Sequence, residues 1–181
     1  MLSSIKKLSV MLVLVVAFTS CNQNPTLQTY FVDHELKPGF TSIDIPTSFL
    51  NIDQTNLSQE QKEAYKSIDK LNMLAFVLSD DNKAEYDVEL NKVKEILKDP
   101  KYEELMRGGN TTDGKFVVKF LGEENSIDEL IVFGNANDKG FAIIRILGDD
   151  MSAEKVAKLY SALDTANINE SQINQFADFF K

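Results

Sequence analysis

The stretch GNTTDGKF contains Gly109–Lys115, which has the G-x-x-x-x-G-K spacing of a phosphate-binding loop. Such a loop needs Ser or Thr after the lysine to bind Mg²⁺, and a helix whose first N–H groups point at the phosphate. Here Phe116 follows the lysine, and the next residues, VVKFL, have the composition of a strand. The sequence therefore predicts a hairpin turn with glycines at positive φ, rather than a nucleotide site.

Three other groups of polar residues could in principle bind a metal ion. NANDKG (Asn135–Gly140) places asparagines at alternate positions, as a calcium loop does, but Lys139 takes the next such position and no acidic residue closes the loop. Asp80–Asp81 and Asp149–Asp150 precede predicted helices, where carboxylates favour the positive end of the helix dipole. We interpret the first group as a turn and the two acidic pairs as helix caps, and predict no metal site and no cofactor.

Acid–base chemistry has few candidate residues. His34, the only histidine, recurs with Leu27 and Phe31 at helical spacing, and the chain has no G-x-S-x-G nucleophile motif to accompany it. Glu103 and Glu104 are adjacent on a predicted strand, so their side chains point to opposite faces and cannot share a substrate. The sequence predicts a packed or half-exposed histidine, no catalytic residue and a protein that is not an enzyme.

The only cysteine, Cys21, follows a basic start and an uncharged apolar run from Leu8 to Ala17. This order is typical of a secretory signal peptide, and the run is too short to span a bilayer comfortably. Phe18-Thr19-Ser20-Cys21 resembles the bacterial lipobox, although Phe18 stands where leucine is usual. The pattern predicts a lipoprotein signal peptide at residues 1–20 and a diacylglycerol attached to Cys21, with enough acyl chain to anchor the protein stably.

The charge pattern and the start of the mature chain bear on location and partners. Asn22 rather than an acidic residue follows the cysteine, and by analogy with lipoprotein sorting we expect an outer-membrane protein that faces the periplasm. The formal charge is −9, and removal of residues 1–20, with two lysines and no acid, makes it more negative by two. So acidic a chain is not expected to bind nucleic acid or anionic lipid through its surface.

Apolar periodicity predicts one α+β domain over residues 27–181, after a tether at 21–26, with its last twelve or so residues loosely docked. The expected architecture is a mainly antiparallel sheet with helices covering one face, in the order β-α-β-α-β-β-β-β-α after a short first helix. We expect strands and helices at the following places: a helix at 27–34, a strand at 40–45, a helix from Ser58 to about Lys70, a strand at 73–78, a helix capped by Asp80 or Asp81 and ended by Asp99-Pro100, strands in YEELMR, KFVVKFL, IDELIVFG and GFAIIRIL, and a helix capped by Ser152.

These elements have the order and patterns of a known family. FTSIDI, LNMLAFVL, YEELMRGG, IDELIVFG and FAIIRILGDDMSAEKVAKL resemble the domain of unknown function 4252 family, small lipoproteins of Bacteroidetes-type bacteria, over roughly Phe40 to Leu163. The resemblance implies a signal peptide, an envelope location and an unassigned biochemical role. Its motifs are strand patterns and turns, so it transfers no functional residues.

The central strands are apolar on both sides, which predicts a covered sheet. Leu130, Val132, Ile144 and Ile146 share one face, and we expect the N-terminal segment, the C-terminal segment around Phe176–Phe180 or a partner to cover it. This face is our candidate interaction surface. The chain is expected to be a non-catalytic, lipid-anchored envelope protein that binds a protein or small ligand. A periplasmic hydrolase-like enzyme and a regulatory lipoprotein that reports the state of the envelope remain the alternatives.

Overall fold

The structure is a computed structural model that describes residues 25–47, 57–110, 112 and 114–158. It has the α+β class and the order of elements that the sequence predicts. The elements are α2 (Leu27–His34), β1 (Phe40–Pro46), α3 (Gln59–Lys66), β2 (Ile68–Val77), α4 (Lys83–Ile96), β3 (Glu103–Asn110), β4 (Gly114–Glu123), β5 (Ser126–Ala136) and β6 (Gly140–Met151), followed by helical residues 153–158.

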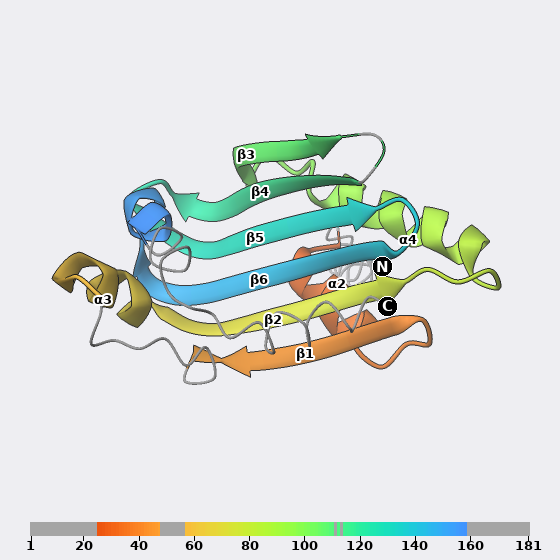
Figure 1. Ribbon diagram of the computed structural model, residues 1–181, viewed down its shortest axis with the longest axis horizontal. Coiled ribbons are helices and arrows are strands. Elements are labelled where there is room, and N and C mark those ends of the chain that lie inside the picture. The colour runs from red at the N-terminus through yellow and green to blue at the C-terminus, as the bar shows by residue number, and fades with distance from the viewer. Residues whose placement is uncertain (1–24, 48–56, 111, 113, 159–181) are drawn as a thin grey trace, which may run out of the picture.

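The six strands form one sheet in the order β1-β2-β6-β5-β4-β3, and every neighbouring pair is antiparallel (Figure 1). Strands β3 to β6 form consecutive hairpins because the turns between them are short and rich in Gly, Asn and Asp. The prediction of a hairpin at Gly109–Lys115 is confirmed: Gly109 has φ of +95° and Gly114 of +135°, values that side-chain-bearing residues rarely adopt. NANDKG is likewise the turn between β5 and β6.

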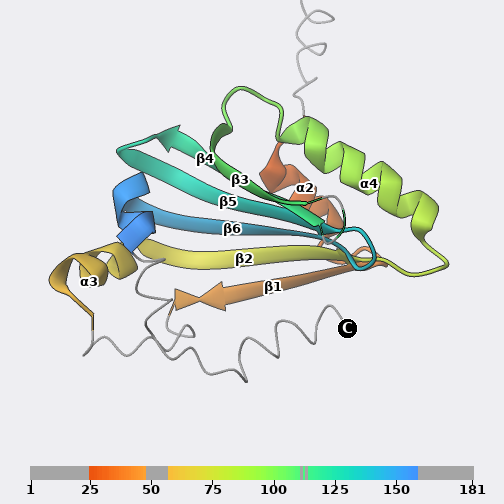
Figure 2. The ribbon, with the colours of Figure 1, turned by 45° about the horizontal axis from the view of Figure 1, so that its top comes forward.

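One face of the sheet, which we call the helical face, is covered by α2 and α4 (Figure 2). Ile131, Phe133, Phe141 and Ile143 point to this face and are at most 6% exposed. They pack with aromatic and aliphatic side chains of both helices, so the apolar stripe predicted for α4 lies in the core as expected.

The other side, the opposite face, is also packed against helices, which the sequence analysis did not predict. Ala64 and Tyr65 of α3 form a second buried cluster with Leu130 and Met151, and Ala153 and Val156 of the last described helix pack against it. Helix α3 and the last described helix lie at the same end of the sheet (Figure 1). Helices therefore contact both faces rather than one.

Two predicted helix boundaries are wrong. The capping box of Ser58 and Gln61 is present, but α3 ends at Lys66 instead of continuing to about Lys70. The residues that follow pair with β1 and β6 from Ile68 onward, so sheet hydrogen bonds compete with the helix for this segment. At the start of α4, the N-cap is Asn82 rather than Asp80 or Asp81.

The Asn82 side chain does not cap the helix, because it bonds the preceding loop instead. Its amide accepts from Ser79 N at 2.8 Å and donates to Val77 O at 2.9 Å. At the end of β6, in contrast, the predicted cap is confirmed: Lys155 N donates to Ser152 Oγ at 3.2 Å.

The sheet has two edge strands. Strand β1 ends in Pro46, which has no N–H to offer. Strand β3 is exposed over nearly its whole length, and its register with β4 shifts between Glu104 and Met106. Across the described ranges, no helix has the length and apolar character needed to cross a membrane.

Candidate functional site

A groove of about 990 Å³ lies between α2 and α4 on the outer side of the helical layer. Its apolar floor includes Tyr30 and Ile96, both buried, and Val88 on α4 is 53% exposed beside them. The groove is lined by Pro25, Tyr30, Asp33, His34, Val88, Asn91, Lys92, Glu95, Ile96, Lys98, Asp99 and Pro100. Concave sites of this size with an apolar floor and a few polar groups are where ligands commonly bind.

The two helices are placed by local sequence signals. Thr26 and Thr29 form a reciprocal capping box at the start of α2, which satisfies N–H groups that a helix start leaves free. With eight residues, α2 is too short to be stable alone and depends on packing. It buries Leu27, Tyr30, Phe31 and His34, as the helical spacing predicts.

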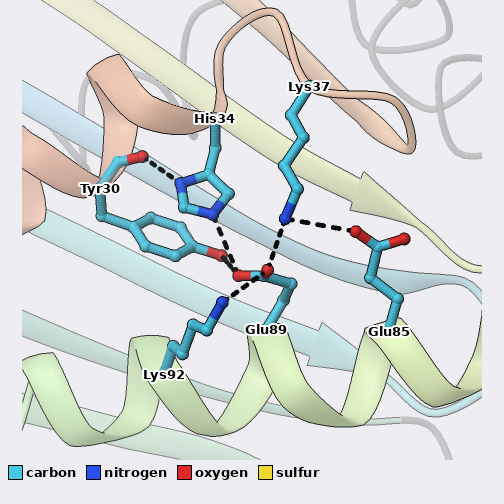
Figure 3. Close-up of polar contacts among 6 residues, drawn as sticks. All are labelled: Tyr30, His34, Lys37, Glu85, Glu89 and Lys92. Carbon is cyan, nitrogen blue, oxygen red and sulfur yellow. Dashed lines mark hydrogen bonds and ion pairs between the residues drawn. The ribbon is translucent and has the colours of Figure 1, made fainter.

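Beneath the groove lies Glu89, a carboxylate of α4 that is 1% exposed. Its Oε1 accepts from Lys37 Nζ at 2.8 Å and from Lys92 Nζ at 2.9 Å. Its Oε2 accepts from the Tyr30 hydroxyl at 3.0 Å and lies 3.2 Å from His34 Nε2. Figure 3 shows these side chains converging from α2, from the loop before β1 and from α4.

His34 contacts both the backbone of its own helix and the buried Glu89. Its Nδ1 lies 2.7 Å from the Tyr30 carbonyl oxygen, which can only accept, so Nδ1 carries a proton. Its Nε2 faces the Glu89 carboxylate, which also accepts. The ring stacks on Tyr30 with centroids 4.0 Å apart, so this histidine is packed, as predicted.

Electrostatics make Glu89 a permanent anion. Burial alone would raise the pKa of Glu89, but hydrogen bonds from Lys37, Lys92 and Tyr30 outweigh it and lower that pKa to about 2. Burial and the neighbouring carboxylate both raise the pKa of the Tyr30 phenol. The hydrogen bond to Glu89 raises the pKa of Lys37, which also contacts Glu85 at 3.3 Å. Near neutral pH, Glu89 is therefore anionic, and Tyr30 and Lys37 keep their protons.

A second buried charge pair lies on the helical face of the sheet. Arg145 of β6 donates to Glu129 of β5 through Nε at 2.6 Å and Nη2 at 2.8 Å. Both residues are under 9% exposed, and the guanidinium lies 5.1 Å from the ring centroid of Phe31 on α2. Glu89 and Arg145 thus contact α2 from two different elements.

Glu89, Glu129 and Arg145 were not predicted from the sequence, although signals for them exist. Glu89 stands on the apolar stripe of α4, three residues after Tyr86 and four before Val93. Glu129 lies two residues from the buried Ile127 and Ile131 on its strand, and Arg145 lies two residues from the buried Ile143 on its own. The two residues have opposite charge. A charge on an otherwise apolar face is unusual unless it is paired, and this rule could have identified all three residues.

The acidic residues considered as metal ligands or acid–base pairs lie apart from the groove. Asp80 pairs with Lys83, Asp150 pairs with Lys155, and Glu104 pairs with Arg107. Among the residues that the structure describes, no group of three or more His, Cys, Asp or Glu side chains is placed to hold a metal ion.

The four residues of the candidate interaction face do share the opposite face of the sheet. Leu130 is 3% exposed within the second cluster, and Val132 and Ile146 pack against that cluster. Ile144 is half-buried. Cys21 and Phe176–Phe180 lie outside the described residues, so the predictions for lipid attachment and for C-terminal cover stay predictions.

Comparison with known proteins defines the family. The family model described as domain of unknown function DUF4252 matches residues 34–159. The chain belongs to this family, as its strand patterns predict. Searches of curated proteins and of solved structures gave no match.

Proposed function

We propose that this chain is a non-catalytic, lipid-anchored envelope protein that binds a protein or small ligand in the groove between α2 and α4. The observation that carries the proposal is the groove itself, in which Tyr30, Val88 and Ile96 lie among polar lining residues. Two of those polar residues, His34 and Lys92, contact the buried Glu89 beneath it. Anchoring at Cys21 is supported by the signal-peptide pattern and the lipobox-like Phe18–Cys21. The outer membrane, on its periplasmic side, is the proposed location.

The state of Glu89 supports a binding role over a catalytic one. A general acid or base works best with a pKa near the pH at which it operates. The pKa of Glu89 is lowered to about 2, and both carboxylate oxygens already accept two contacts each. This carboxylate stabilises the helical layer that forms the groove, and it has no proton to exchange with a substrate near neutral pH.

Site-specific photocrosslinking in native envelopes tests the groove. A photoreactive side chain at Val88, which lines the groove, should give a reproducible adduct, whereas one at Val32 should not. Val32 is the matched control because it is a similarly exposed valine, at 63%, on the neighbouring helix but outside the groove. Native mass spectrometry of the purified protein would detect a small ligand. Adducts at Ile144 on the opposite face, with none at Val88, would transfer the proposal to the sheet face.

Two measurements test the anchor separately. Intact-mass analysis of protein from membranes should show cleavage before Cys21 and a lipid adduct on it, and Cys21→Ser should release the protein from membranes. Protease treatment of whole cells should leave the protein intact if it faces the periplasm. A full-length, unmodified chain in the membrane fraction would contradict the anchor but would leave the groove proposal standing.

A further inference from the structure

The C-terminal end of α4 lies beside the point at which the chain enters the domain. Leu27 N, at the start of α2, donates to the Tyr102 hydroxyl at 3.1 Å. Pro25 lines the same end of the groove as Lys98 and Pro100. Cys21 is four residues before Pro25, and four extended residues span at most about 14 Å. An acyl chain on Cys21 would therefore hold this end of the domain close to the bilayer surface.

This end is basic although the chain as a whole is acidic. Between residues 92 and 101 there are four lysines and two acidic residues, Glu95 and Asp99, whereas residues 80 to 89 hold one lysine and five acidic residues. Glu103 and Glu104 follow on β3, where Glu104 pairs with Arg107. The charge of α4 and its flanking loops thus changes sign along the helix, with the positive end at the tether. The overall charge of −9 does not describe the surface that would meet the membrane first.

Three of these lysines are available to a ligand. Lys94 is exposed and makes no ion pair with any residue that the structure describes. Lys98 pairs with Glu95 at 2.6 Å, but both side chains are 69% exposed, and such pairs are weak in water. Lys101 lies over the ring of Tyr102, 5.0 Å from its centroid. Lys92 is excluded because it binds the buried Glu89.

Helix capping accounts for only part of this arrangement. A lysine in the last turn of a helix stabilises the negative end of its dipole, and Lys94 occupies that turn. Lys98 and Lys101 lie beyond Ile96, the last residue of α4, where the effect of the dipole falls away. Their position beside the tether therefore calls for a different explanation.

We propose that Lys94, Lys98 and Lys101 form a surface that binds anionic phospholipid headgroups and orients the anchored domain. The proposal rests on the proposed acylation of Cys21, which brings these side chains to the bilayer. Electrostatic attraction acts over about 8–10 Å at physiological ionic strength, which suits a tether of this length. The acidic remainder of the domain is repelled by the same surface, so the basic end faces the membrane and the sheet points away from it.

Lysine footprinting on vesicles tests the proposal without relying on acylation in cells. The chain from Cys21 to Lys181 has a single thiol, which can be coupled to a maleimide phospholipid in vesicles of phosphatidylcholine, with or without phosphatidylglycerol. Amine acylation followed by mass spectrometry then reports each lysine. Anionic vesicles should lower the labelling of Lys94, Lys98 and Lys101 about fivefold relative to neutral vesicles. Lys62 and Lys66 on α3 should be labelled equally on both, and high salt should remove the protection.

A double substitution tests whether the lysines act together. In K94Q/K98Q, the protection of Lys101 by anionic vesicles should fall, whereas in the control K62Q/K66Q it should stay unchanged. Equal labelling on neutral and anionic vesicles, or full protection of Lys101 in K94Q/K98Q, would overturn the proposal. Because the coupling is chemical, absence of the lipid adduct in cells would refute the proposed anchor and leave this measurement interpretable on its own.

Discussion

The two faces of the sheet are stabilised by different chemistry. The helical face buries Glu89, Glu129 and Arg145 among its aromatic and aliphatic side chains. Among the residues that the structure describes, no buried acidic or basic side chain lies on the opposite face. Aliphatic packing tolerates many orientations of a helix, whereas a bidentate ion pair or a carboxylate with four partners tolerates few. The charged groups therefore specify where α2 lies.

This difference matters because α2 is the element next to the tether. Glu89 binds Tyr30 and His34 of α2, and Arg145 lies over Phe31 of the same helix. A helix of eight residues gains little stability from its own hydrogen bonds. We infer that the two charged contacts fix the geometry of the groove by fixing α2, and the following predictions test that inference against the apolar face.

The largest effect is expected from breaking the ion pair on the helical face. Arg145→Leu leaves Glu129 buried without its partner, and the free energy of unfolding should fall by about 3–5 kcal/mol. The double variant E129L/R145L removes both charges and should recover most of that loss. Urea unfolding measures both. Equal losses in the single and double variants would mean that packing, rather than the unpaired charge, sets the cost.

On the opposite face, stability should depend on volume alone. Leu130→Ala removes a side chain that is 3% exposed and should cost about 2–4 kcal/mol. Ile144→Ala, at a half-buried position, should cost less. These losses should be the same at pH 7 and pH 4, because no charge is involved. A strong pH dependence would contradict the distinction between the faces.

The Glu89 cluster should show an intermediate loss and a defined pH dependence. Glu89→Gln should lower the free energy of unfolding by about 1–3 kcal/mol, because Lys37 and Lys92 can turn to water. The folded pKa, about 2, lies below the ordinary value of 4.5, so the carboxylate stabilises the fold above about pH 4.5. That stabilisation declines as the pH falls towards 2.

The difference in stability between wild type and Glu89→Gln should therefore shrink between pH 4.5 and pH 2. Urea unfolding at several pH values across this interval measures it. A difference that grows on acidification would mean that the carboxyl group is protonated in the folded protein, which would contradict the described contacts.

The smallest effect is expected at the hairpin that resembles a phosphate-binding loop. Gly109 and Lys115 lie on paired strands, with no helix start to orient N–H groups towards a phosphate. ATP or GTP with Mg²⁺ should leave Tm unchanged. A clear rise in Tm, which binding to the native state must produce, would show that this end of the sheet binds ligands after all.

The sequence predicts most of the fold because its periodic signals are strong. The stripe from Tyr86 to Leu97 and the alternation in β5 and β6 each identify an element, and the Gly- and Asn-rich turns identify the hairpins. It misplaces the end of α3 because Ile68–Lys70 pair with other strands, a contact that local sequence does not contain. That helices cover both faces of the sheet was not predicted either, because it too depends on contacts between distant segments.

The candidate groove could not be predicted because it depends on how two helices pack. Residues of α2 and α4 that line it are more than fifty positions apart, and neither segment contains a motif for binding. The buried charges were within reach of sequence analysis, since each interrupts an apolar pattern. Their partners could not be predicted from the sequence, because those of Glu89 come from three segments of the chain.

The edges of the sheet have a consequence for the protein at high concentration. An exposed edge strand is a template on which a second chain can add, and repeated addition produces fibrils. Pro46 ends one edge strand with a residue that has no N–H, and the register shift between Glu104 and Met106 distorts the other. These irregularities disfavour edge-to-edge polymerisation, so molecules confined to a crowded surface should remain discrete instead of forming amyloid-like ribbons.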